Sequence, residues 1–285
     1  MKIIKTMSSV LAACIMAVMF TSPAAAMTAV GDVSVPYGTP NIDGTISEGE
    51  WDKAAKIELS SKNAKAWEGI VPDDFKTNVS VFWDESGLYI AGEVTDSAVK
   101  QSSDGQYNGD AFQVSIDMGQ YFATTNENRA IFYSWGYNEN KPMIQRQESK
   151  NDAVMYNGEG VTVNTVKSDK GWNFEIKLDW DTLTNDAKLK GAGDLNVSAG
   201  FKLNAMFCYL DYDANGQRVN MFGTTKTDES VAYDWGPKDH GVTFTLAENE
   251  APKADNAPAT ADFTALIVLA AAASGAALAV IKRRN

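Results

Sequence analysis

Cysteine is nearly absent from this chain, which holds two among its 285 residues, Cys14 and Cys208. Cys14 falls within an apolar N-terminal segment, so loss of that segment would leave Cys208 alone and exclude an intramolecular disulfide. Histidine occurs once, as His240. The sequence has no G-x-S-x-G, no H-E-x-x-H and no recognisable pairing of cysteine with histidine, so none of these catalytic motifs supports an enzyme.

Positive charge is scarce between the apolar segments near the two ends of the chain. All 37 acidic residues lie there, against 20 basic ones, which gives this middle part a net charge of −17. A chain so acidic is a poor binder of nucleic acid and of anionic membrane surfaces. With no disulfide available, its stability must come from a hydrophobic core, and roughly 210 residues of one domain are enough to form one.

Residues 1–26 have the pattern of a secretory signal peptide. Two lysines near the start precede an apolar run, Val10–Phe20, and Ala24–Ala26 forms an A-x-A cleavage site. Leu11–Cys14 also matches a lipobox, which would lipidate its cysteine, but the apolar run continues beyond that cysteine. We therefore expect cleavage at the alanine site and export of the rest of the chain.

An uncharged apolar segment of 19 residues, Phe263–Ile281, is followed by Lys282, Arg283 and Arg284. As a helix it would be about 28 Å long, at about 1.5 Å per residue, which is enough to cross a bilayer. The basic residues after it favour a cytoplasmic C-terminus by the positive-inside rule. We therefore predict a membrane anchor and basic tail over residues 263–285, with the middle of the chain outside the cell.

Residues 248–262 are rich in alanine, proline, asparagine and aspartate, which is typical of a spacer between a domain and a surface. Within them, Asn256–Asp262 resembles the cell-wall sorting signals of Gram-positive bacteria, in which a Pro-x-Thr core precedes an apolar stretch and a basic tail. Ala257 and Ala261 stand where the usual leucine and glycine would be. Two alternatives follow: cleavage by a sortase after Thr260, or a plain membrane anchor.

Apolar and polar residues alternate along many short segments of residues 27–247, as expected for half-buried strands. Residues 112–116 are the clearest case, with phenylalanine, valine and isoleucine separated by glutamine and serine. Similar alternation marks Trp172–Leu178 and Phe201–Tyr209. Further strands are expected at Val79–Trp83, Leu88–Val94, Arg129–Trp135, Val161–Lys167 and Val242–Leu246.

Turn signals such as Asn157-Gly158 and Asn215-Gly216 separate these segments, and the best helix signal is the short stretch Asp179–Leu183. Many short strands with few helices predict an all-β domain. We expect an antiparallel β-sandwich of the jelly-roll or immunoglobulin-like kind over residues 27–247.

Asp211, Asp213 and Asn215 have the oxygen-ligand spacing of a calcium loop. Position 12 of such a loop is Phe222 instead of the bidentate glutamate of an EF-hand, and strands rather than helices flank it. We expect a solvated β-turn here, with bound structural calcium as the alternative.

Five stretches of the chain occur in the order of a known family. They are Tyr37–Gly44 followed by Glu50-Trp51, Val81–Ile90, Gly109–Asp117, Gly216–Val219, and Trp235 with Gly241–Leu246. Through these stretches the chain resembles carbohydrate-binding module family 9, found on bacterial xylanases, and the wider group of DOMON-like sandwich domains. The resemblance covers about residues 36–247 and implies a non-catalytic, sugar-binding β-sandwich, in a family whose members also bind structural calcium.

The resemblance also implies which residues contact the ligand. Family members grip a sugar between two aromatic side chains, and the matching positions are Tyr107 and Trp235. Gln113 and Asn204 match polar partners on neighbouring strands. A pyranose suits such a site because its axial C–H groups stack on aromatic rings while its hydroxyls need fixed hydrogen-bonding partners. Alternation places Gln113 and Asn204 on the face away from the core, which we expect to be open to ligand.

Three departures from the family concern specificity. Tyr107 stands where the family shows tryptophan, Gln113 stands where it has glutamate, and no arginine lies near Tyr133, where the family places one. These changes favour retention of sugar binding over retention of a preference for cellulose or xylan ends.

Most tryptophans are expected in the core. Trp51, Trp83, Trp172 and Trp180 lie in strand or helix patterns, whereas Trp67 and Trp235 are flanked by loop residues. Of these two, Trp235 is expected to contact ligand, with packing under a loop as the alternative.

The sequence thus predicts an extracellular protein, attached to membrane or wall, that binds polysaccharide or oligosaccharide without changing it. The first alternative is a structural or adhesive surface protein that binds a glycoprotein. A glycoside hydrolase is third, because two of the 37 acidic residues could lie at the separation that glycosidases use, and only the fold decides this.

Overall fold

The computed structural model describes residues 31–103, 108–125, 127–147, 152–224 and 241–249, and most of them lie in two β-sheets. The strands of the first, sheet A, are β1 (Val33–Val35), β3 (Ala64–Glu68), β6 (Ala111–Met118), β7 (Ile131–Gly136), β8 (Ile144–Gln147), β9 (Ala153–Met155), β12 (Lys202–Tyr212), β13 (Arg218–Thr224) and β14 (Val242–Leu246). Those of the second, sheet B, are β2 (Ala55–Ser60), β4 (Lys76–Trp83), β5 (Gly87–Thr95), β10 (Val161–Ser168) and β11 (Gly171–Asp179). The helices are α1 (Tyr121–Thr125) and α2 (Trp180–Leu189).

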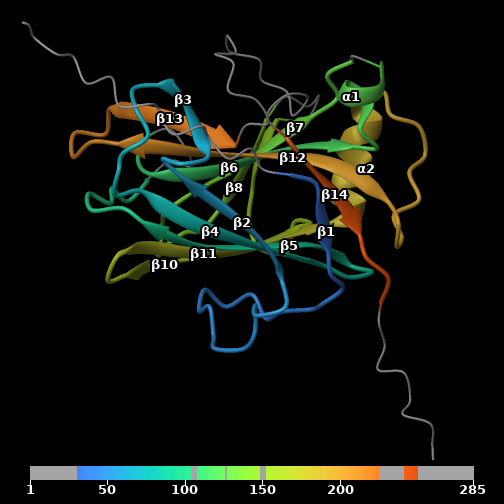
Figure 1. Ribbon diagram of the computed structural model, residues 1–285, viewed down its shortest axis with the longest axis horizontal. Coiled ribbons are helices and arrows are strands. Elements are labelled where there is room, and N and C mark those ends of the chain that lie inside the picture. Colours follow the sequence, from blue (N-terminus) through green and yellow to red (C-terminus); the bar gives the residue numbers. More distant parts are fainter. Residues whose placement is uncertain (1–30, 104–107, 126, 148–151, 225–240, 250–285) are drawn as a thin grey trace, which may run out of the picture.

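The strand order of sheet A is β1-β14-β12-β6-β7-β8-β9, and β12 also pairs with β13, which pairs with β3. Sheet B has the order β10-β11-β5-β4-β2. The pairs in the two sheets are antiparallel except β1 with β14, which run parallel. In Figure 1 the sheets form two layers, with β6 and β12 in the upper one and β4, β5 and β11 in the lower one. The predicted antiparallel β-sandwich is confirmed in this two-layer arrangement.

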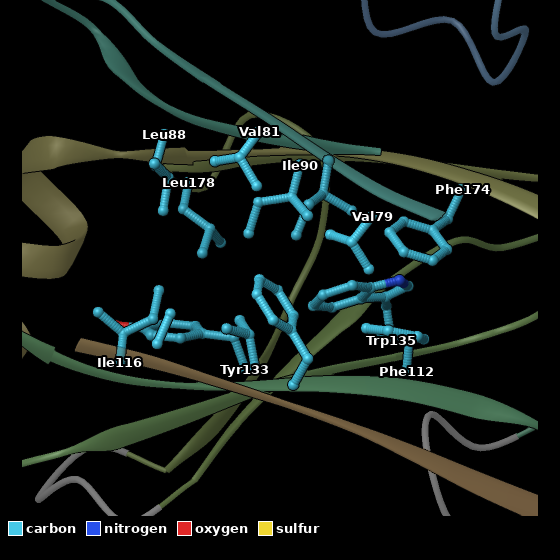
Figure 2. Close-up of a cluster of buried hydrophobic side chains, with 14 of the residues drawn as sticks. Val79, Val81, Leu88, Ile90, Phe112, Ile116, Tyr133, Trp135, Phe174 and Leu178 are labelled. Carbon is cyan, nitrogen blue, oxygen red and sulfur yellow. The ribbon is translucent and has the colours of Figure 1, made fainter. Parts of the chain in front are cut away.

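The main core fills the space between the sheets. Figure 2 shows Val81, Ile90 and Phe174 of sheet B facing Phe112 and Trp135 of sheet A, all of them buried. The ring centroids of Phe112 and Phe174 are 4.9 Å apart, within the range of favourable aromatic contacts across an interface. Alternation along the strands therefore assigns one side of each strand to this core, as the sequence predicts.

A loop between β1 and β2 covers the outer face of sheet B, and is drawn in blue below the lower layer of Figure 1. It is held by Glu175 of β11, whose carboxylate accepts hydrogen bonds from the backbone N–H of Asp43 and of Gly44 and from Nε1 of Trp51. Burial raises the pKa of Glu175 above its usual value, with the three donors opposing the shift in part. Asp43, Gly44 and Trp51 of the family-like stretches thus have a structural role.

Every predicted strand overlaps a strand of the structure, whereas helix α1 and strands β1, β2, β3, β8, β9 and β13 were not predicted. The predicted helical turn continues beyond Leu183, because α2 runs to Leu189 and packs Leu183 and Ala187 onto the core. Trp67, predicted in a loop, lies on β3, where pairing with β13 holds a short segment extended. The predicted core tryptophans, Trp51, Trp83, Trp172 and Trp180, are confirmed as buried.

The predicted signal peptide and most of the spacer lie outside the described residues, as does the predicted anchor over residues 263–285. In the described part of the chain, no helix has the length and apolar character needed to cross a membrane.

Candidate functional site

Two of the four residues predicted to contact ligand are described by the structure. Gln113 lies on β6 and Asn204 on β12, adjacent strands of sheet A. Tyr107 and Trp235, the predicted aromatic clamp, lie outside the described residues.

Both polar residues point to the face of sheet A that is turned away from the main core. Their neighbours Phe112, Val114 and Leu203 belong to that core, so the predicted orientation is confirmed. The expected exposure is wrong, because 3 % of Gln113 and 1 % of Asn204 is accessible. Alternation indicates which face a side chain occupies, but it does not indicate what covers that face.

The two side chains occupy separate parts of this outer face. Asn204 pairs with Asp117, which is four residues along β6 from Gln113, or about 13 Å at the usual rise of a strand. Asn204 Oδ1 accepts a hydrogen bond of 3.0 Å from Nε2 of Gln120. They therefore cannot act as a close pair, and a ligand that contacts both has to extend along the strands.

Gln113 is the middle residue of a row that crosses five strands of sheet A. Strand register places Gly223, Cys208, Gln113, Ser134 and Gln145 side by side on β13, β12, β6, β7 and β8. Nε2 of Gln113 donates a hydrogen bond of 2.7 Å to Oγ of Ser134. This row combines amide and hydroxyl groups, which can both donate and accept hydrogen bonds and so match the hydroxyls of a sugar.

Ser134 and Gln145, the other members of this row with hydroxyl or amide side chains, were not predicted as site residues. The outer-face position of Ser134 could have been predicted, because it alternates with Tyr133 and Trp135 in a strand that the sequence predicts. Gln145 carried no usable signal, since β8 has four residues and owes its extended conformation to pairing with β7.

Asp117, next to Asn204, has a structural role. Its carboxylate accepts hydrogen bonds from the backbone N–H of Tyr121, at 3.1 Å, and of Phe122, at 2.7 Å, in the first turn of α1. Burial raises the pKa of Asp117, while these backbone donors and Arg129 oppose the shift.

The segment with calcium-loop spacing, predicted as a β-turn, forms a tight turn after β12. Asp213 Oδ1 accepts hydrogen bonds of 2.9 Å from the backbone N–H of Asn215 and of Gln217, and these contacts lower the pKa of Asp213. Asp211 points elsewhere, with Oδ2 accepting a hydrogen bond of 2.5 Å from Asn220. The geometry is that of a β-turn closed by an aspartate, as the sequence favours.

Asp211 instead meets two other acids. Oxygens of Asp96, Asp110 and Asp211 lie within 4.8 Å of one another. Asp110 is fully buried and accepts backbone hydrogen bonds from Lys100, at 2.6 Å, and from Tyr212, at 2.9 Å. Burial, with the charges of Asp96 and Asp211, raises the pKa of Asp110 to about 8 despite those two donors. These three aspartates connect the loop after β5 to the ends of β6 and β12.

A cleft of about 720 Å³ lies beside the loop after β5 and the turn between β10 and β11. Charged residues of both signs line it, among them Asp74, Asp96, Lys100, Lys167 and Lys170. None of its lining residues is aromatic, so it offers no ring on which a pyranose could stack.

The two sheets form a β-sandwich. Residues 42–241 match the family described as "Carbohydrate family 9 binding domain-like", and the chain belongs to this family. Its domain is a non-catalytic carbohydrate-binding module, so the assignment to a non-enzyme class is confirmed.

Two curated enzymes and one solved structure resemble the chain. An exoglucanase of Acetivibrio thermocellus is 25% identical over 204 residues, which are 72% of this chain and 16% of that protein. An endo-1,4-beta-xylanase of Thermoanaerobacterium saccharolyticum is 24% identical over 153 residues, 52% of this chain and 11% of that protein. The chain therefore spans less than a fifth of either enzyme, and the similarity is due to their binding modules.

The solved structure is a carbohydrate-binding module of family 9 from Caldicellulosiruptor kristjanssonii in complex with glucose. Its TM-score is 0.52 at 15% sequence identity, and the match covers 79% of this chain and 99% of that one. At this identity the likeness establishes a shared fold.

Proposed function

We propose that this protein binds a polysaccharide or oligosaccharide outside the cell and leaves it chemically unchanged. Membership of the family is the observation that carries the proposal. It is supported by Gln145, whose amide suits the hydrogen bonding of a sugar and is partly accessible at the end of the row that contains the buried Gln113 and Ser134. The solved relative in complex with glucose makes a glucose-containing saccharide the first ligand to test.

The proposed site combines this row with the aromatic pair implied by the family, Tyr107 and Trp235. An aromatic ring excludes water from the apolar face of a pyranose, and fixed polar groups beside it select the pattern of hydroxyls. A β-sandwich suits this task because strands hold side chains at fixed spacing, which lowers the entropic cost of binding.

We further propose that the domain is exported and held at the cell surface. The signal-like residues 1–26 and the apolar segment Phe263–Ile281 support this location. Residues 248–262 would then be the spacer between domain and surface, with sortase cleavage after Thr260 as an alternative means of attachment.

A glycan array probed with the chain, followed by analysis of each hit for cleavage products, tests the proposal. Binding without products is the expected result. Products released from a bound glycan would refute the non-catalytic role. Absence of binding across the array, from protein shown to be folded, would refute sugar binding and favour an adhesive surface protein that binds a glycoprotein.

A further inference from the structure

Trp67 is held in an unusual position at the edge of sheet A. Strand β3 pairs Ala66 with Phe222 and Glu68 with Met221, so Trp67 is the extra residue of a β-bulge. Bulges re-aim side chains and are frequent beside functional sites. Figure 1 shows β3 and β13 together at one end of the upper layer.

The ring of Trp67 lies against the backbone of β13 at Gly223. A Cβ atom on Gly223 would approach Cη2 of Trp67 to 2.6 Å, so any larger residue would displace the ring. Gly223 is also the first residue of the row that contains Gln113, two strands away, or about 10 Å at the usual strand spacing. Trp67 therefore lies at the end of the polar row, on the same outer face.

A second apolar cluster forms the floor beneath Trp67. It consists of buried residues on the face of sheet A opposite to the main core, namely Ala111, Cys208, Leu210, Tyr212 and Met221. Trp67 packs on this cluster and keeps part of its surface accessible. A partly exposed indole supported from below by buried apolar side chains has a fixed orientation, which is what stacking on a sugar requires.

Charged groups lie next to Trp67 at this edge. Arg218 of β13 donates two hydrogen bonds to Glu68 of β3, from Nε at 2.8 Å and from Nη2 at 2.6 Å. Both side chains remain partly exposed and hold each other in a planar, bidentate arrangement. Sugar sites commonly combine an apolar ring with a few well-placed polar groups of this kind.

We infer that Trp67 is an aromatic platform for a second unit of a β-linked gluco-oligosaccharide, so that it contributes to the binding of cellotriose and not to the binding of glucose. The inference rests on the proposed function. In a β-linked glucose unit every ring substituent is equatorial, so both faces of the unit are apolar and a chain can present successive faces to aromatic rings. Trp67 lies at the edge strand, where part of the indole is accessible, while Gln113 and Ser134 in the middle of the row are buried.

Glucose, cellobiose and cellotriose, titrated calorimetrically into the full 285-residue chain in mild detergent, test the inference. Trp67→Leu keeps an apolar side chain on the cluster but lacks a flat ring, whereas Trp67→Phe keeps a smaller ring. We expect Trp67→Leu to weaken cellotriose binding roughly tenfold and to leave glucose binding unchanged. Trp67→Phe should retain most of the affinity. Val219→Ala, which shortens an exposed apolar residue of β13, is the matched control and should change neither the glucose affinity nor the cellotriose affinity.

Oxidation of the unmodified chain by N-bromosuccinimide, read by mass spectrometry, gives a test that does not depend on how the variants fold. Cellotriose should protect Trp67 and glucose should not. Unchanged cellotriose affinity in Trp67→Leu, or equal oxidation with both sugars, would overturn the inference while sugar binding stands. If Trp67→Leu weakened glucose binding as much as cellotriose binding, Trp67 would belong to the first subsite and the second-unit assignment would be refuted. Failure of the folded wild-type chain to bind any of the three sugars would refute both this inference and the function proposed for β-glucose saccharides.

Discussion

Oε1 of Glu175, on β11, accepts a hydrogen bond of 2.8 Å from Nε1 of Trp51, which lies 124 residues earlier in the chain. The contact is buried on the outer face of sheet B and joins the loop before β2 to strand β11 of that sheet. A hydrogen bond to a buried carboxylate is among the stronger kinds in proteins, so this one should contribute measurably to stability.

Trp83 provides a matched control for this bond, because its buried Nε1 has no hydrogen-bond partner among the described residues. Trp51→Phe and Trp83→Phe remove the same atoms from the core, but only the first removes a hydrogen bond. We expect Trp51→Phe to lower the free energy of unfolding by about 1–3 kcal/mol more than Trp83→Phe, measured by urea denaturation. Equal losses in the two variants would show that the bond adds little.

Asp110 should make stability depend on pH. Its folded-state pKa of about 8 exceeds the ordinary value of 3.8, so the folded protein keeps a proton that the unfolded chain releases between these values. The contribution of this group is therefore full below about pH 4 and falls as the pH rises towards 8. Asp110→Asn should flatten this slope in urea denaturation at pH 5 to 8. An unchanged slope would mean that Asp110 is ionised in the folded state.

The aromatic clamp implied by the family makes a prediction about Tyr107 and Trp235. Loss of a stacked ring together with its buried area should weaken binding roughly tenfold or more, because aromatic contacts add about 0.5–1.5 kcal/mol to area burial. Trp235→Ala and Tyr107→Ala should barely change the melting temperature, since both residues lie outside the alternating core positions. Calorimetric titration and thermal unfolding of the same samples provide the two readouts. If Trp235→Ala unfolds the domain or binds sugar normally, Trp235 is a packing residue.

Gln113 and Asn204 should influence which sugar is preferred. An unpaired buried hydroxyl costs about 1–3 kcal/mol, so Asn204→Ala should penalise the sugar whose hydroxyl it meets and spare others. Gln113 also binds Ser134, so Gln113→Ala is expected to reduce stability as well. Gln113→Glu, which introduces the residue found in the family, should shift preference with a smaller loss. Identical rank orders of sugars for wild type and variants on a glycan array would exclude both residues from the site.

The location proposed for the protein depends on its C-terminal segment. Deletion of residues 263–285 should release the protein into the medium, because the deleted part contains the uncharged apolar segment. Fractionation of native cells should find the full-length chain in the membrane or wall. Full-length protein found mainly in the cytoplasm would contradict both export and anchoring.

Alternation predicted the long strands, since their apolar side faces one continuous core. Phe112, Val114 and Ile116 are all in that core, and Trp172 and Phe174 meet it from sheet B. Short strands were missed because pairing, and not local pattern, determines them. The segment Ala64–Glu68 contains residues that favour helix, and β13 nevertheless holds it extended.

The candidate site was only partly predictable for a related physical reason. Alternation along β6 and β12 correctly predicted that Gln113 and Asn204 lie on the outer face of sheet A. It predicted neither their burial nor their separation along the strands. The position of Trp67 over Gly223 depends on a β-bulge that the sequence does not predict. Contacts between residues about 150 positions apart have to be read from the fold.

The pairing of β14 between β1 and β12 determines how the domain would respond to mechanical load. β14 ends at Leu246 and only Ala247 separates it from the predicted spacer, so tension on a surface tether would pull this strand along its own axis. Its hydrogen bonds to β12 on one side and to β1 on the other lie across that direction, and the bond from Ala247 N–H to the carbonyl of Val35 extends them to the edge of the sheet. A force along this strand loads all of these hydrogen bonds together instead of one after another. A pull through the tether would therefore not separate β14 from the sheet residue by residue.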